Sequence, residues 1–156
     1  ELMSAIEESD GKIIIWAYFR HSIEEIKLTL QKEYGMNAVA TYFGDTPDEE
    51  RSEIVERFQD MDNELRFFVG QPRTGGYGLT LTAAHTMIYY ANGYDLETRL
   101  QSEARIDRYG QTHKMTYIDL FTPNTVDEKI VDALVNKMDI ANIILQENPR
   151  DWIKND

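Results

Sequence analysis

The sequence contains no cysteine and only three histidines among its 156 residues. Without cysteine the chain can form neither a disulfide framework nor a thiolate metal site, a composition that fits an intracellular protein. The three histidines are far apart in the sequence and lack the spacing of metal ligands: His21, His85 and His113. We therefore expect no metal site built from this chain's own side chains.

Long hydrophobic runs are also missing. The longest one, Ile13–Phe19, has seven residues, whereas a membrane-spanning helix needs about 18–20. The chain shows no basic and apolar leader of the kind that directs secretion. We expect no membrane association and a single domain, because 156 residues with 42% hydrophobic content suffice for one sizeable core.

Basic residues are few: 16 Lys and Arg stand against 28 Asp and Glu, which gives a net charge of −12. Affinity for nucleic-acid backbones depends on clustered Lys and Arg, so this balance argues against a free-standing nucleic-acid-binding protein. The charge is uneven, however. Between Arg99 and Lys114 four basic residues outnumber two acidic ones, which allows a local basic site on an acidic body.

Apolar segments of strand type alternate with segments of helical periodicity. We predict strands over Lys12–Phe19, Asn37–Phe43, Leu65–Gly70, Thr86–Ala91 and Met115–Phe121. Capping boxes predict helix starts at Ser22, Thr46 and Thr125, and Gly35 ends the first of these helices. This order predicts a three-layer α/β/α fold around a mostly parallel sheet. We expect the domain to cover residues 12–145, with 1–11 as a linker or the end of a preceding helix and 146–156 as a tail.

The stretch at residues 101–111, QSEARIDRYGQ, is predicted to lie in one amphipathic helix. Asp95 is a suitable N-cap, and Gly110 is suited to end the helix in a left-handed conformation. Apolar residues at every fourth position predict its buried face: Leu96, Leu100 and Ala104.

Gln101, Arg105 and Arg108 stand at positions i, i+4 and i+7 and would share another face of that helix. Two guanidinium groups one turn apart form a fork of donors suited to a phosphate, because guanidinium stays charged and binds oxyanions bidentately. The simpler alternative for two arginines alone is a solvated helix face.

A glycine-rich loop at residues 71–78, QPRTGGYG, follows the third predicted strand. Glycine has no Cβ, so backbone N–H groups in such a loop can approach a phosphate closely. The loop is not a Walker A motif, and Leu81 replaces the third glycine of a dinucleotide-binding fingerprint. Because the carboxyl ends of parallel strands share one edge of the sheet, the loop and the start of the arginine helix should converge there.

These motifs, in this order, resemble the C-terminal RecA-like lobe of superfamily two helicases, specifically the Swi/Snf-type double-stranded-DNA translocases. The resemblance extends from about Lys12 to Met138. KIIIWAYF is similar to motif IV, RTGGYGLTLTAA to motif V, and QSEARIDRYGQ to motif VI at every position of Gln-x-x-x-Arg-x-x-Arg-x-Gly-Gln. Thr80 stands where the family usually has asparagine, and Ala104 where it has aspartate, which favours a divergent phage-type or bacterial branch.

The resemblance implies roles for individual residues. Arg105 and Arg108 match arginine fingers that reach the γ-phosphate of ATP, and Gln101 would support them. Gly76 and Gly78 would lie beside the nucleotide.

The remaining motif positions would contact DNA. These are Arg73, Thr74 and Gly75 in motif V and His21 at the end of motif IV.

The resemblance also implies partners: ATP with Mg²⁺, the N-terminal RecA-like lobe of the same protein, and double-stranded DNA. Motifs I, Ia, II and III belong to that other lobe and are absent here, so this chain alone should not hydrolyse ATP. The implied location is cytoplasmic or nucleoid-associated.

Two alternatives stay open. The lobe could be a non-catalytic module that binds nucleic acid or protein, or a small nucleotide-binding α/β domain of unrelated chemistry. The sequence also leaves open whether the motor would separate strands or only move along duplex DNA.

Overall fold

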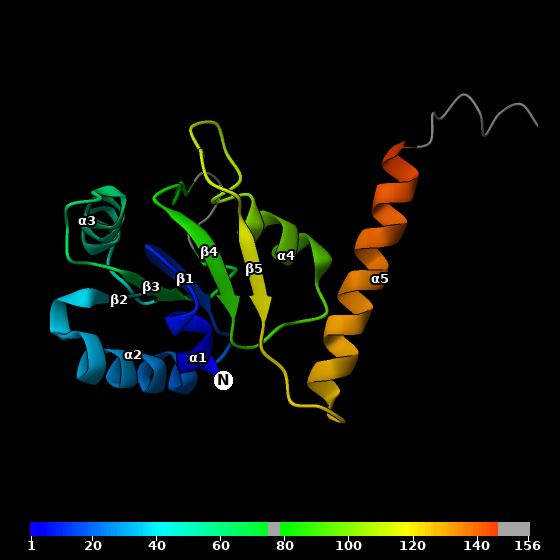
Figure 1. Cartoon of the computed structure of the whole chain (residues 1–156), viewed down its shortest axis with the longest axis horizontal. Helices are drawn as coiled ribbons and strands as arrows, with labels where there is room; N and C mark the ends of the chain where they lie inside the picture. The colour runs from blue at the N-terminus through cyan, green and yellow to red at the C-terminus, as the bar shows by residue number, and fades with distance from the viewer. Residues whose placement is uncertain (75–78, 147–156) are drawn as a thin grey trace, which may run out of the picture.

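The structure, a computed structural model, describes residues 1–74 and 79–146 and contains a five-stranded sheet in the order β2-β3-β1-β4-β5 (Figure 1). Every strand pairing among these residues is parallel. The elements are α1 (Leu2–Glu7), β1 (Lys12–Trp16), α2 (Arg20–Tyr34), the 3₁₀ helix η1 (Met36–Ala38), β2 (Val39–Tyr42), α3 (Asp48–Gln59), β3 (Phe67–Gly70), β4 (Ala84–Tyr89), α4 (Leu96–Glu103), β5 (Thr116–Asp119) and α5 (Val126–Gln146).

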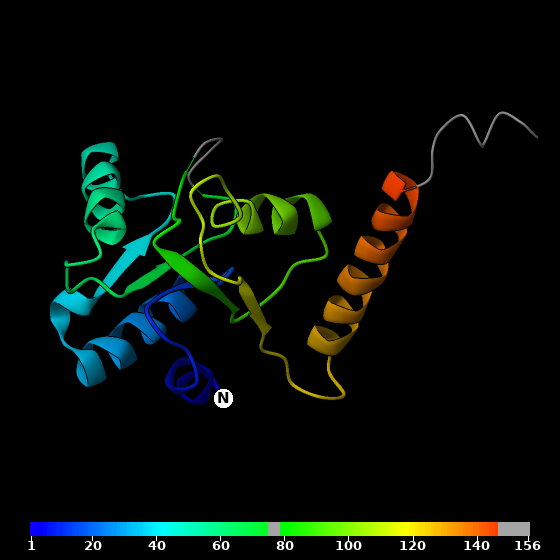
Figure 2. The ribbon, with the colours of Figure 1, turned by 45° about the horizontal axis from the view of Figure 1, so that its top comes forward.

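Helices cover both faces of the sheet, which confirms the predicted three-layer α/β fold (Figures 1 and 2). All five residues of β1 are buried, because successive side chains enter opposite cores. Ile13 and Ile15 pack with α1 and α2 in one core. Ile14 and Trp16 pack with α3 and with the segment that follows α4 in the other.

The last residues of the five strands are aligned in one row. Trp16 pairs with Gly70 and with Tyr89, while Tyr42 pairs with Gly70 and Asp119 with Tyr89. The loops that follow the strands therefore begin at the same carboxyl edge, the edge at which ligands bind in such sheets.

Two of the three predicted capping boxes are not formed. α2 begins two residues before Ser22, which lies buried inside the helix, so core packing overrides the local capping pattern. α3 begins two residues after Thr46, whose hydroxyl instead accepts a hydrogen bond from the Phe43 N–H. The third start is as predicted, because the Thr125 hydroxyl accepts a hydrogen bond from the Asp127 N–H.

The two ends of the domain are helical. α1 lies within the predicted linker, and its Ile6 is fully buried in the core. α5 extends away from the sheet beside α4 (Figures 1 and 2), where Leu134 is buried and the Lys137 ammonium donates to the Tyr94 carbonyl at 2.7 Å. No helix within the described ranges is long and apolar enough to cross a membrane.

Gly70 is the position where the sheet tolerates no side chain. A Cβ there would lie 2.5 Å from the Tyr42 carbonyl oxygen and 3.3 Å from the Trp16 ring. Gly70→Ala should therefore lower the free energy of unfolding by about 2 kcal/mol, the usual cost of overpacking a core. Denaturant-induced unfolding followed by circular dichroism measures this change.

Gly44→Ala is the matched control, because nothing lies within 4 Å of a Cβ at Gly44. Its unfolding free energy should stay within about 0.5 kcal/mol of the parent value. Equal unfolding midpoints for the two variants would contradict the proposed steric restriction at Gly70.

Candidate functional site

The helix after β4 begins as predicted. One carboxylate oxygen of Asp95 accepts from the Glu97 N–H at 3.1 Å, and the other accepts from the Thr98 hydroxyl at 2.6 Å. The hydrogen bond from Thr98 is the main reason why the pKa of the Asp95 carboxyl lies below its usual value. This cap fixes where the chain leaves the carboxyl edge to form α4.

The end of this helix differs from the prediction. α4 stops at Glu103, and the chain continues through turns to Gly110, which has a φ of 100° but does not end the helix. Gln101, Arg105 and Arg108 therefore do not share a helical face, and that prediction is wrong. The Gln101 amide lies on the exposed surface and donates to the Glu97 carboxylate at 2.9 Å.

The buried face of α4 is also polar rather than apolar. Leu100, expected to face the core, is 45% exposed, whereas Thr98, Arg99 and Ser102 are buried. The helix is oriented by polar contacts, since the Ser102 hydroxyl lies 2.7 Å from that of Tyr89. The leucine pattern predicted the wrong face because it carried no information about these partners.

Arg99 forms the centre of this polar contact. Its guanidinium pairs with Glu103 at 2.5 Å and with Asp119 at the end of β5, and it lies 3.6 Å from the centre of the Tyr89 ring. Burial alone would lower the pKa of Arg99, but the hydrogen bonds to Asp119 and Glu103 outweigh burial and raise it. Apart from the local excess of basic residues, no sequence pattern predicts this network.

Arg105 is buried at the carboxyl edge, only 5% exposed. Its guanidinium donates to the carbonyls of Pro72 at 2.8 Å and Thr74 at 2.9 Å, and it lies 4.9 Å from the centre of the Trp16 ring. Burial lowers the pKa of Arg105. The residue thus joins the stretch after α4 to the first part of the glycine-rich loop.

Arg108, by contrast, is exposed. Its Nε donates to the Ala104 carbonyl at 2.9 Å, and its Nη1 donates to the Thr80 hydroxyl at 3.0 Å. Thr80 also lines a groove of about 460 Å³ between α3 and residues 79–80, and Arg51 lines it from α3. Two guanidinium groups are therefore associated with one groove.

Two glutamines hold the segment that leads into β4. The Gln111 amide donates to the Ala84 carbonyl at 2.9 Å, and the Gln59 carbonyl oxygen accepts from the Ala83 N–H at 2.9 Å. The motif VI pattern contained Gln111, but nothing in the sequence singled out Gln59.

The predicted DNA-contacting residues occupy the glycine-rich loop and the start of α2. Arg73 is exposed and pairs with Asp95 at 3.2 Å, and the Thr74 N–H donates to the Gln71 carbonyl at 3.0 Å. His21 is exposed in the first turn of α2, with its ring stacked on Phe19 at 5.6 Å between ring centres. The remaining predicted residues lie outside the described residues: Gly75, Gly76 and Gly78.

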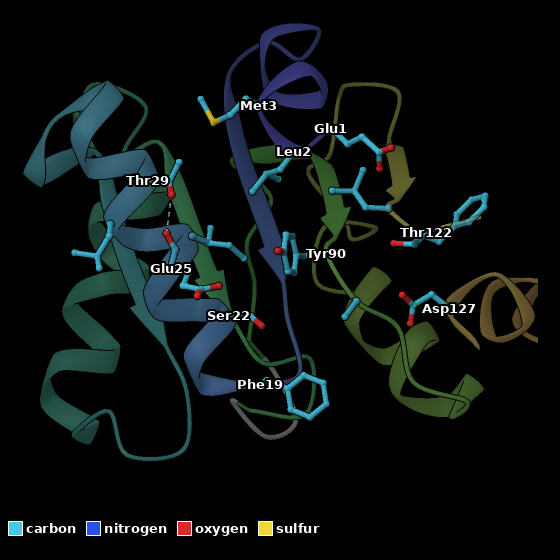
Figure 3. A pocket seen from close by; sticks show the side chains of 15 residues that line it. Glu1, Leu2, Met3, Phe19, Ser22, Glu25, Thr29, Tyr90, Thr122 and Asp127 are labelled. Atoms are coloured by element: carbon cyan, nitrogen blue, oxygen red, sulfur yellow. Dashed lines mark hydrogen bonds between the residues drawn. The ribbon is translucent and has the colours of Figure 1, made fainter. Parts of the chain in front are cut away.

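A second groove, of about 1000 Å³, lies on the other side of the sheet, between α1, α2 and the residues after β4 and β5 (Figure 3). Glu25 and Asp127 line it together with apolar side chains such as Leu2 and Phe19, and no Lys or Arg occurs among its described lining residues. Carboxylates repel phosphate, so this groove is electrostatically unsuited to a nucleotide or a nucleic-acid backbone.

Metal binding by the chain itself has no candidate in residues 1–74 and 79–146. These residues contain no group of three or more His, Cys, Asp or Glu side chains that could hold a metal ion.

A family model described as "Helicase conserved C-terminal domain" matches residues 1–110. The human SWI/SNF-related matrix-associated actin-dependent regulator of chromatin subfamily A member 1 is 27% identical over 150 residues, which cover 94% of this chain and 14% of that protein. The yeast transcription regulatory protein SNF2 is 34% identical over 103 residues, 66% of this chain and 6% of that protein.

A crystal structure of the C-terminal part of the Fun30 ATPase domain has a TM-score of 0.72 with 22% identity, covering 80% of this chain and 39% of that one. This likeness supports the RecA-like assignment of the fold. The chain thus spans only a small part of its curated relatives, about one seventh of the human one. The match over residues 1–110 shows that this chain belongs to the helicase conserved C-terminal domain family, with SWI/SNF-type proteins among its relatives.

Proposed function

We propose that this chain is the C-terminal motor lobe of an ATP-dependent DNA helicase or translocase. The observation that carries the proposal is the contact between Arg108 and Thr80, which joins the motif VI and motif V stretches across 28 residues. The family match supports a shared role in an ATP-dependent motor. Translocation along duplex is the favoured activity, because the motifs resemble those of the Swi/Snf-type double-stranded-DNA translocases.

Arg108 is proposed to be the arginine finger. Its guanidinium is exposed beside the groove lined by Thr80 and Arg51, so it can meet an anion presented by a second domain. Guanidinium keeps its charge and offers several donors, which suits the charge that develops on a transferred phosphoryl group. In other enzymes such a residue raises kcat by a factor of about 10³–10⁵.

ATP with Mg²⁺ is proposed to bind between this lobe and an N-terminal RecA-like lobe of the same protein. The support for one side of such a site is that Arg108 contacts Thr80 at the groove, which Arg51 lines together with Glu56. When bound, ATP supplies the phosphoryl group that is transferred to water. The Walker A loop that binds its phosphates is not in this sequence and would come from the other lobe.

Double-stranded DNA is proposed to contact the carboxyl edge through Arg73, Thr74 and His21. Arg73 is exposed in the loop after β3, and His21 is exposed in the first turn of α2, which follows β1. Phosphate contacts of this kind position a motor without reading sequence. An intracellular location is proposed as well, consistent with the absence of cysteine.

The half-motor proposal predicts that the isolated chain hydrolyses no ATP. Activity should appear when an N-terminal RecA-like lobe from the parent gene is added or fused, and duplex DNA should stimulate it. A coupled phosphate-release assay measures both. Turnover by the carefully purified chain alone would contradict the half-motor proposal. A two-lobe protein that binds DNA but hydrolyses no ATP would favour the binding-module alternative.

Arg108→Ala in the two-lobe protein should lower kcat by about 10³ or more, because the developing phosphoryl charge loses its partner. Steady-state ATPase kinetics with a duplex-binding assay test this, and the duplex affinity should change little. Arg57→Ala on α3 removes an equal charge from a residue that does not line the groove and should leave kcat unchanged. Equal rates for Arg108→Ala and the parent protein would remove the finger assignment.

Arg73→Ala should weaken duplex binding by the two-lobe protein and reduce its salt dependence. Loss of one phosphate contact should lower the slope of log K against log salt by about 0.9. Fluorescence anisotropy at several salt concentrations measures the slope, again with Arg57→Ala as the control for net charge. An unchanged slope would exclude a phosphate contact at Arg73.

A further inference from the structure

The two arginines of QSEARIDRYGQ occupy opposite environments. Arg105 is buried and its guanidinium is bonded to backbone carbonyls, whereas Arg108 is exposed. We propose that Arg105 is a positioning residue, which ties the glycine-rich loop to the turn that carries Arg108, and does not itself contact the nucleotide. This inference rests on the proposed function and refines it.

The side chain of Arg105 holds the first part of the loop. Nη2 donates to the Pro72 carbonyl and Nη1 to the Thr74 carbonyl, at 2.8 and 2.9 Å, in a forked geometry that only guanidinium supplies. The group also packs against the Trp16 ring in the core. To reach a phosphate, the guanidinium would have to leave both carbonyls without their donors at a buried site, which is unfavourable.

The backbone of Arg105 holds the other end of the same segment. Its carbonyl accepts from the Leu81 N–H at 2.9 Å, so one residue binds the chain both before and after residues 75–80. Ile106, the next residue, is fully buried and fixes the turn to the core. Arg105 thus joins the residues on both sides of this segment to the turn that carries Arg108.

Arg108 depends on this same turn. Its Nε donates to the Ala104 carbonyl, immediately before Arg105, and its Nη1 donates to Thr80, immediately before Leu81. A displacement of Thr74 must therefore strain or break the Arg105 hydrogen bonds and shift the residues that orient Arg108. Arg73, the proposed DNA contact, is adjacent to Thr74, so duplex binding and the finger are linked through Arg105.

The variant Arg105→Lys tests whether Arg105 connects these segments, and Arg108→Lys is the matched control. Both variants keep the positive charge, but lysine cannot supply the forked pair of guanidinium donors. In the isolated chain, amide hydrogen exchange should accelerate about tenfold or more at Thr74 and Leu81 in Arg105→Lys and change little in Arg108→Lys. Exchange at the central strand amides of Ile14 and Phe68 should stay slow in both.

In the two-lobe protein, the informative quantity is the ratio of the ATPase rate with duplex to the rate without it. Arg105→Lys should lower this ratio about fivefold or more, whereas Arg108→Lys should lower both rates together and preserve the ratio. A finger role for Arg105 would preserve the ratio and leave exchange at Thr74 and Leu81 unchanged. A general loss of fold would accelerate exchange at Ile14 and Phe68 as well.

Either of these last two results overturns the proposal. If the parent two-lobe protein shows no duplex-stimulated ATPase, the proposed function fails instead. The exchange measurement on the isolated chain then decides alone whether Arg105 ties the two segments.

Discussion

The ion pair between Arg99 and Asp119 is the contact on which the candidate site depends. It joins α4 to the end of β5, and it takes the place of the apolar face that α4 lacks, since Leu100 points to solvent. Removing Asp119 would leave the buried Arg99 guanidinium with Glu103 as its remaining carboxylate partner, which is unfavourable. The turn at residues 104–110 begins where this helix ends, so the placement of Arg105 and Arg108 follows from it.

Much of the fold could be predicted because its signals are local. The continuous apolar run in β1 indicated a strand covered on both faces, and the alternation of strands with helices indicated a parallel sheet. Helix boundaries were harder, because capping patterns compete with burial. Ser22 has the right chemistry and spacing for a cap but lies buried inside α2, where packing of that helix determines its position.

The candidate site could be predicted by residue identity but not by environment. Motif VI identified Arg105 and Arg108 together, and nothing in the sequence distinguishes them. Their difference arises from contacts with residues about 30 positions away, Pro72 and Thr74 for one and Thr80 for the other. The role of Gln59 could not be predicted either, because no nearby sequence pattern indicates its contact with Ala83.

Electrostatics explains how so acidic a chain can serve a site for phosphates. Its net charge of −12 repels nucleic acid, and the groove of Figure 3 is lined by Glu25 and Asp127. The exposed cations Arg73 and Arg108 do not line that groove; they belong to the glycine-rich loop and to the Thr80 contact. For the proposed DNA contact, repulsion elsewhere would restrict productive binding to this region. The negative charge would then favour the correct orientation of DNA on the lobe and lower the affinity of the lobe for DNA. Such a balance fits a lobe that acts together with a partner domain.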